Sequence, residues 1–388
     1  MKAKIQKVIL LLFILTPLFC LSEIFEYLGL GLSFDMFFIK LPKDILMIFL
    51  LLMCTIFSFR YKHPHNYYIC LLLLFSFTII CFAFSYSLNG LQIAMAGVRW
   101  AIPFFLLILL YDVVDIDLLK KVTKILFCLL ILHAAVQLLE MLFFPPRKGL
   151  NIFGFPGRLP GIFVHPSASG TFAAFCFYVI RYFQEGKIRL LGLVIAILSV
   201  FLSMSSTGVI LLFLLIFMPW YLKSKHKGIL SIVAVLFLFL VVTNLDFLTG
   251  RGEGSSAVSG GTRIQILQEI VDSAEPISTN FGLATNTAIN LMSSFGIQSN
   301  AYIADSLYTS VLTNYGAIFF FLFISAILYL LLYLFVRKKI DIPFGLIFLI
   351  SITSGVSIII VEMFPMNIII AVFLSYFMKE YSFISKNK

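Results

Sequence analysis

The chain has 388 residues, of which 61% are hydrophobic and only 12% are charged, and its mean hydropathy is +1.07. A soluble domain carries about twice that share of charge, so the long apolar runs of this chain need lipid as their solvent. The net charge of +10 does not indicate a nucleic-acid partner. The basic residues form short tufts between apolar runs, whereas a nucleic-acid site needs a basic stripe interleaved with aromatic residues.

Apolar segments follow one another along nearly the whole chain. A stretch of about 17–25 apolar residues crosses a bilayer as a helix. The basic N-terminus and the apolar run behind it have no small-residue cleavage site, so we expect an uncleaved first span. The sequence predicts an all-α polytopic membrane protein, a single integral membrane domain over 1–388. About twelve transmembrane helices are expected, at 5–21, 43–59, 67–84, 97–112, 122–143, 167–183, 189–204, 207–222, 229–245, 316–336, 342–361 and 366–380.

Orientation follows from the distribution of Lys and Arg. With both termini in the cytoplasm, every inside segment is basic and most of the 28 Lys and Arg residues lie inside. We expect a multi-pass protein of the cell inner (plasma) membrane. The inside loops are too short for a soluble catalytic domain. One long extracytoplasmic loop, 246–315, is expected to carry short helices, so any chemistry should sit on the extracytoplasmic face.

The basic residues left outside are the first candidates for a binding site. Five of the eight are Arg, whereas the inside residues are mostly Lys. Arg is the fork-shaped donor that binds phosphate bidentately. Ordinary anchoring at the membrane interface is the alternative for any one of them. They are Lys40, Lys43, Arg99, Arg147, Lys148, Arg158, Arg251 and Arg263.

Residues 144–166 connect the fifth and sixth expected spans and are rich in Pro and Gly, which excludes a helix over most of this stretch. Irregular backbone at a membrane surface is tolerated where it is buried in protein or lines a watery cavity. Arg147, Lys148, Arg158 and His165 could converge there. Pro166 should hold His165 in an extended conformation at the start of the sixth span. A surface loop with scattered charges is the alternative.

In the long loop, residues 262–265 form a capping-box pattern ahead of an amphipathic helix that Pro276 ends. Arg263 falls in the first turn of this helix on its apolar side, where free amides favour an anion. Arg251 lies among glycines with no helix to fix it. Asp305 and Tyr308 begin the next helix, where Asp305 is either an N-cap or a ligand of sugar hydroxyls.

His133, Gln137 and Glu140 are spaced i, i+4 and i+7 on the fifth span and therefore share one face. A charge at mid-bilayer costs roughly 3 kcal/mol on the insertion scale, so this face should point into the bundle. It is either a structural polar network or, through Glu140, part of a substrate site. The six cysteines lie in or beside apolar segments and form no CxxC pair, so we expect no disulfide, metal or cofactor.

Several of these segments together resemble the O-antigen polymerase (Wzy-type) and O-antigen ligase superfamily. The resemblance covers about 155–320. Its residues are Arg158 to Pro166, Leu202 to Gly208, Arg263, Phe281-Gly282, Asp305 to Tyr308 and Asn314 to Gly316. Thr207 stands where many members carry Arg, which puts a Ser–Arg role in doubt. Asp305 stands where ligases tend to have His, which favours a polymerase.

The resemblance implies a GT-C-like, metal-independent glycosyltransferase that polymerises polysaccharide repeat units of O-antigen or capsule. Such an enzyme moves a glycan from undecaprenyl diphosphate to the non-reducing end of an incoming lipid-linked unit. In this interpretation Arg158 and Arg263 stabilise the leaving diphosphate and His165 is the general base. Direct binding of the diphosphate or sugar and a purely structural anchor are the alternatives for His165. The other expected substrate contacts are Arg147, Lys148, Arg251, Asp305, Tyr308, Arg99 and Glu140. The expected partners are undecaprenyl-diphosphate-linked oligosaccharides, the lipid bilayer and a chain-length regulator protein, with no nucleic acid.

Other functions remain open from the sequence. A ligase would transfer the glycan to a different acceptor. A polysaccharide flippase or other transporter would place charges through mid-bilayer and show two similar halves, and neither feature is evident. An assembly scaffold would also fit a set of outside arginines with little chemistry nearby.

Overall fold

The protein is described by a computed structural model. It describes residues 1–20, 36–63, 65–143, 158–163, 165–226, 228, 232, 265, 268–285, 306–336, 342–356 and 358–380.

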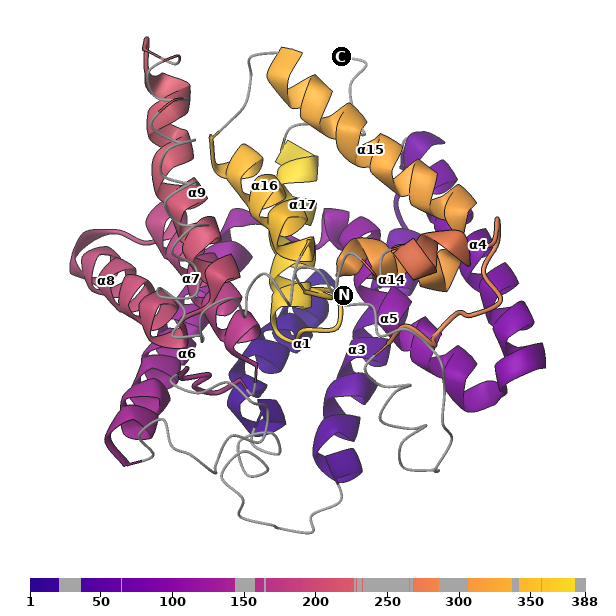
Figure 1. Ribbon diagram of the computed structural model, residues 1–388, viewed down its shortest axis with the longest axis horizontal. Coiled ribbons are helices and arrows are strands. Elements are labelled where there is room, and N and C mark those ends of the chain that lie inside the picture. The colour runs from indigo at the N-terminus through magenta and orange to yellow at the C-terminus, as the bar shows by residue number, and fades with distance from the viewer. Residues whose placement is uncertain are drawn as a thin grey trace. The chain divides into compact units, whose positions relative to one another are not determined.

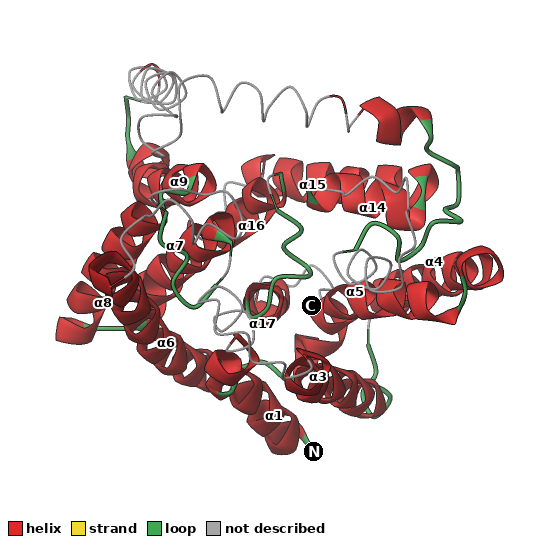
Figure 2. Ribbon diagram, turned by 60° about the horizontal axis from the view of Figure 1, so that its bottom comes forward, coloured by secondary structure: helices red, strands yellow, loops and turns green. Residues whose placement is uncertain are grey.

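Within these residues the fold is helical throughout, with no strand (Figures 1 and 2). The helices are α1 (Lys2–Ile14), α3 (Met36–Ser58), α4 (His65–Asn89), α5 (Leu91–Leu109), the 3₁₀ turn η1 (Leu110–Asp112), α6 (Ile116–Phe143), α7 (Pro166–Phe183), α8 (Gly186–Ser203), α9 (Ser206–Lys223), α14 (Leu307–Tyr315), α15 (Ala317–Val336), α16 (Ile342–Gly355) and α17 (Met366–Glu380).

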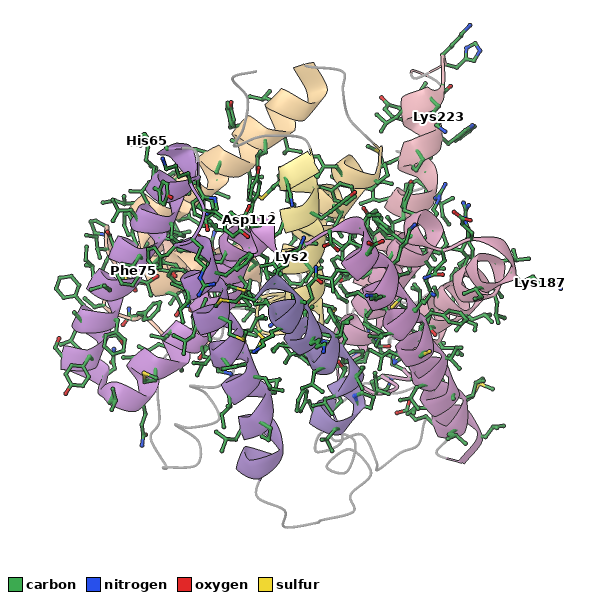
Figure 3. All side chains as sticks on the ribbon, turned by 180° about the vertical axis from the view of Figure 1, so that it is seen from behind. Lys2, His65, Phe75, Asp112, Lys187 and Lys223 are labelled. Atoms are coloured by element: carbon green, nitrogen blue, oxygen red, sulfur yellow. The ribbon has the colours of Figure 1, made fainter. Side chains whose placement is uncertain are left out.

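The chain is an α-helical membrane protein. Large apolar side chains lie exposed along its helices, such as Leu72 on α4. Phe75, on the same helix, is another (Figure 3). Water accommodates such faces poorly and lipid accommodates them well. Among the described residues, six helices are long and apolar enough to cross a membrane. They are Leu41–Ser58, Tyr67–Asn89, Leu91–Asp112, Ile116–Leu142, Gly186–Ser203 and Ser206–Lys223.

Hydropathy located the helices well. Eleven of the twelve expected ranges overlap observed helices, six of which are long and apolar enough to cross a membrane, and nearly all of the remaining range, 229–245, lies outside the described residues. The region between the third and fourth expected spans differs from expectation, because α4 and α5 are separated by a single residue. Gly90 makes this break with φ +82°, a conformation that costs glycine little.

The chain divides into two compact units. Unit 1 comprises Met1–Ile9, Asp44–Ile116 and Thr262–Lys388, and unit 2 comprises Leu10–Lys43 and Asp117–Gly261.

The core of unit 2 is α7, which contacts α6, α8 and α9 (Figure 2). Almost all of its residues from Pro166 to Ile180 are buried, and many of them are small. A Cβ added to Gly208 of α9 would lie 2.8 Å from the Cα of Gly170, so the two helix backbones touch. Small residues allow this close approach between helices in a membrane.

Arg181, near the end of α7, replaces a backbone hydrogen bond that α9 lacks. Pro219 has no N–H, so the carbonyl of Leu215 lacks its usual partner four residues along the helix. The Nη1 of Arg181 donates to that carbonyl at 2.7 Å. Arg181 therefore joins α7 to α9 through a single charged hydrogen bond to backbone.

In unit 1, residues 275–285 pack onto α4 and α5. Phe281 is fully buried, and a Cβ on Gly97 of α5 would lie 2.4 Å from its ring. The Oγ of Ser85 on α4 donates to the Phe281 carbonyl at 2.6 Å. Asn314 of α14 accepts the Gly282 N–H on its Oδ1 at 2.7 Å. This irregular stretch is therefore part of the core of unit 1.

Candidate active site

The polar face of α6 points into unit 2, as the helical spacing predicts. His133 and Gln137 are fully buried and Glu140 is 4% exposed. What covers them is the segment 158–163, which we call the α6–α7 segment. It is the described part of the loop that joins those two helices.

Each α6 side chain bonds to the backbone of the α6–α7 segment. The Oε2 of Glu140 accepts the Gly161 N–H at 3.0 Å, and Nδ1 of His133 accepts the Ile162 N–H at 3.3 Å. The Nε2 of Gln137 donates to the Leu159 carbonyl at 2.9 Å. Backbone polar groups in a bilayer must be satisfied internally. Of the situations that the sequence left open, burial in protein is the one observed for this segment.

His133 has no spare lone pair for chemistry. Because its Nδ1 accepts an N–H, the ring is neutral and its proton lies on Nε2. That nitrogen lies 3.0 Å from the Oγ of Ser169 on α7, to which it donates. The same Oγ accepts from Gln137 Nε2 at 3.2 Å. His133 and Gln137 therefore tie α6, α7 and the α6–α7 segment into one network.

Arg158 begins the α6–α7 segment and is 4% exposed. Its Nε and Nη2 donate to the carbonyl of Met204 at 3.2 and 2.9 Å. Met204 ends α8 in a left-handed conformation, φ 46°, and Ser205 then caps α9 by accepting the Gly208 N–H. The last carbonyls of a helix lack partners and carry partial negative charge, so a guanidinium is favoured there.

His165 is the N-cap of α7, with φ −101° and ψ 123°, and Pro166 follows at the first helical position. The predicted extended geometry at the start of this helix is confirmed. The side chain is exposed, and its Nδ1 accepts the Ser167 N–H at 3.2 Å. Capping therefore occupies the lone pair that a neutral imidazole would use as a base.

The other predicted site residues divide into two groups. Arg99 and Tyr308 lie in unit 1. Arg99 pairs with Asp44 at 3.2 Å, and the Tyr308 hydroxyl donates to the Ile352 carbonyl at 3.1 Å. Burial raises the pKa of Tyr308 to about 12. The predicted residues that lie outside the described part of the chain are Arg147, Lys148, Arg251, Arg263 and Asp305.

The helix expected after Asp305 is present, but its N-cap is Ser306. The Oγ of Ser306 accepts the Thr309 N–H at 3.2 Å, and the Oγ1 of Thr309 accepts the Ser306 N–H at 3.3 Å. The observed cap of α14 is therefore Ser306, and Asp305 lies outside the described residues. A serine competes well with an aspartate for this position, so the sequence alone did not separate them.

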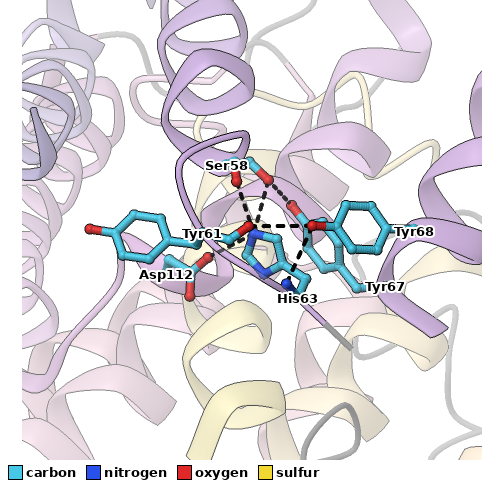
Figure 4. A network of polar contacts seen from close by, with 6 residues as sticks. All are labelled: Ser58, Tyr61, His63, Tyr67, Tyr68 and Asp112. Carbon is cyan, nitrogen blue, oxygen red and sulfur yellow. Dashed lines mark hydrogen bonds and ion pairs between the residues drawn. The ribbon is translucent and has the colours of Figure 1, made fainter. Parts of the chain in front are cut away.

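A second polar cluster, which the sequence did not suggest, lies at the turn between α3 and α4 in unit 1 (Figure 4). The Nε2 of His63 lies 3.4 Å from Oδ2 of Asp112 and 3.1 Å from the Ser58 carbonyl. Its ring stacks on Tyr67 with centroids 4.0 Å apart. Both oxygens are acceptors, so Nε2 carries a proton. Through Asp112 the cluster ties η1 to this turn, and His63 and Asp112 are too far apart in sequence to form a motif.

Gly161 offers a direct test of how the α6–α7 segment docks. Its φ is +63°, and an added Cβ would lie 2.5 Å from the His133 ring. We expect Gly161→Ala to lower the unfolding temperature and the amount of folded protein more than Gly186→Ala does. Gly186 has nearly the same φ, +60°, with nothing within 4 Å of the added Cβ. The backbone cost of about 1–2 kcal/mol is then common to both, and any excess is steric. Equal losses of stability in the two variants would mean that Gly161 does not lie against the His133 ring.

No family model, curated protein or solved structure matched this chain.

Proposed function

We propose that this chain is a polysaccharide repeat-unit polymerase of the plasma membrane. It would be a GT-C-like protein of about twelve spans with both termini in the cytoplasm. In the proposed reaction a glycan passes from undecaprenyl diphosphate to the non-reducing end of an incoming lipid-linked unit on the extracytoplasmic face.

One observation carries the proposal most: the segments that bear the family resemblance contact one another within each unit. In unit 2, Arg158 bonds to Met204, so the stretch from Arg158 to Pro166 meets the stretch from Leu202 to Gly208. In unit 1, Gly282 bonds to Asn314. Within each unit, residues of the resemblance that are far apart in the chain therefore lie together, as residues of one site must. The chemistry proposed for them rests on the resemblance.

The proposed mechanism needs a cation where the diphosphate leaves. As the glycosidic bond breaks, the bond electrons pass to the diphosphate oxygen and its negative charge grows. A preorganised guanidinium in a dry environment stabilises that charge without a metal ion. Arg158, buried beside the α8–α9 turn, is the described residue suited to this role, and Arg263 is the second proposed cation. The donor lipid lies in the bilayer while its sugars lie in water, so the site belongs at the membrane surface.

The proposal is tested with purified protein in proteoliposomes supplied with undecaprenyl-diphosphate-linked oligosaccharides. A polymerase converts them into a ladder of products that differ by one repeat unit. A flippase would move the units across the bilayer without lengthening them. A ligase would need a separate acceptor, and a scaffold would change nothing. Unchanged single units after prolonged incubation with active substrate would contradict the proposal.

Chelation provides a separate prediction. Because arginines are proposed to take the place of a cation at the diphosphate, ladder formation should continue at an unchanged rate in excess EDTA. Gel analysis of products with and without EDTA measures this. Loss of activity with EDTA, followed by recovery on adding magnesium, would mean that a divalent ion rather than arginine stabilises the leaving group.

A further inference from the structure

Glu140 is the ionisable carboxyl on the buried face of α6. A carboxyl inside a membrane-spanning helix is expensive to maintain and usually marks a functional position. Its Oε2 accepts a bond from the Gly161 N–H at 3.0 Å. Among the described residues, Glu140 forms no ion pair with a Lys or Arg. A structural bond to one backbone N–H needs only a neutral acceptor, which a glutamine would supply at a lower desolvation cost.

The position of Glu140 links it to the proposed cation. Gly161, to which it bonds, is three residues after Arg158 in the α6–α7 segment. That segment is held at one end by Arg158 on the Met204 carbonyl and at the other by Glu140 and His133 on the backbone. The guanidinium of Arg158 belongs to the α6–α7 segment, and the carboxyl of Glu140 is bonded to the backbone of the same segment.

The nearby histidines are less suited to accept a proton. His133 uses both ring nitrogens, one accepting from Ile162 and the other donating to Ser169. His165 uses Nδ1 to cap α7. A carboxylate has two oxygens, so Glu140 can keep its bond to Gly161 on Oε2 while Oε1 accepts a proton.

We infer that Glu140 is the general base of the proposed glycan transfer, an inference that rests on the proposed function. The acceptor hydroxyl gives its proton to Oε1 of Glu140 as its oxygen bonds to the anomeric carbon of the donor glycan. The bond from that carbon to the diphosphate oxygen breaks, and its electrons leave with undecaprenyl diphosphate. The proton then passes from Glu140 to solvent, which restores the carboxylate. No oxidant, reductant or further reactant is needed.

Two substitutions separate a base from a structural ligand. Glu140→Gln keeps an oxygen at the same reach for the Gly161 N–H but cannot accept the proton. Glu140→Asp keeps the carboxylate but is one methylene shorter, so it strains or loses the bond to Gly161. A base predicts that Asp retains more ladder-forming activity than Gln, with Gln reduced about a hundred-fold or more. A structural ligand predicts the reverse order, with Gln close to wild type.

The rates are measured in the proteoliposome assay and divided by the amount of monodisperse folded protein. Glu185→Gln is the matched control, because Glu185 is an exposed glutamate of the same unit whose side chain makes no capping bond to α8. It should retain wild-type activity. If wild type and Glu140→Gln form the ladder at similar rates, the base role is wrong and the proposed polymerase function is retained. No ladder from wild type would overturn both.

Discussion

Arg158→Ala is expected to reduce polymer formation by at least about a hundred-fold while leaving inserted protein in the membrane. Removing one preorganised donor to a developing anion typically costs about 3–4 kcal/mol of transition-state stabilisation. Arg158→Lys should recover little of this loss, because an ammonium keeps the charge but lacks the planar fork that holds both Nε and Nη2 on the Met204 carbonyl. Initial rates of ladder formation per folded protein measure both variants.

Arg181 provides the control for this prediction. It also donates from its guanidinium to a helix carbonyl in unit 2, that of Leu215, but it lies near the opposite end of α7 from His165. Arg181→Ala should therefore lower stability, as loss of a charged hydrogen bond does, without lowering the rate per folded molecule. If Arg181→Ala reduces that rate as much as Arg158→Ala does, then Arg158 acts only through the packing of unit 2.

Gly282→Ala should cause a larger loss of folded protein than Gly161→Ala, Gly186→Ala or Gly90→Ala. The φ of Gly282 is +92°, and its added Cβ would lie 2.0 Å from the Ile93 carbonyl oxygen and 2.8 Å from the Gly97 nitrogen. Both are backbone atoms of α5, so no side chain can rotate to relieve the overlap. The expected destabilisation is about 3 kcal/mol or more, measured by thermal unfolding in detergent and by the monodisperse fraction.

Gly90→Ala isolates the conformational part of that effect. Gly90 lies in the same unit with φ +82°, and nothing lies within 4 Å of its added Cβ. Its ψ of 170° places it in a region that almost only glycine adopts, so Gly90→Ala should cost only this backbone penalty, about 1–3 kcal/mol. Similar losses for Gly90→Ala and Gly282→Ala would show that residues 275–285 do not pack against α5 as described.

Much of this fold follows from local features of the sequence. Apolar runs predict where the helices lie, and the spacing of His133, Gln137 and Glu140 predicts that they share a buried face. The His165-Pro166 pair predicts an extended residue at the start of α7. Each of these depends on neighbours within a few residues, so the physical cause can be read from the chain directly.

The partners of these groups could not be predicted in the same way. Periodicity gives α6 a buried face but does not say that residues 159–162 cover it. Likewise the pairing of Arg158 with the Met204 carbonyl joins positions 46 residues apart. His63 and Asp112 are farther apart still and carry no motif. Such contacts are chosen by how whole helices pack, and several sequence patterns are compatible with more than one packing.

The most direct test of the polymerase account is the stoichiometry of lipid diphosphate release. Proteoliposomes containing the purified chain would receive radiolabelled undecaprenyl-diphosphate-linked repeat units. Free undecaprenyl diphosphate and new glycosidic bonds would then be counted together. The account predicts one undecaprenyl diphosphate released for every bond formed, with both rates falling together in Arg158→Ala. Movement of intact lipid-linked units across the bilayer, with neither lipid release nor bond formation, would contradict it.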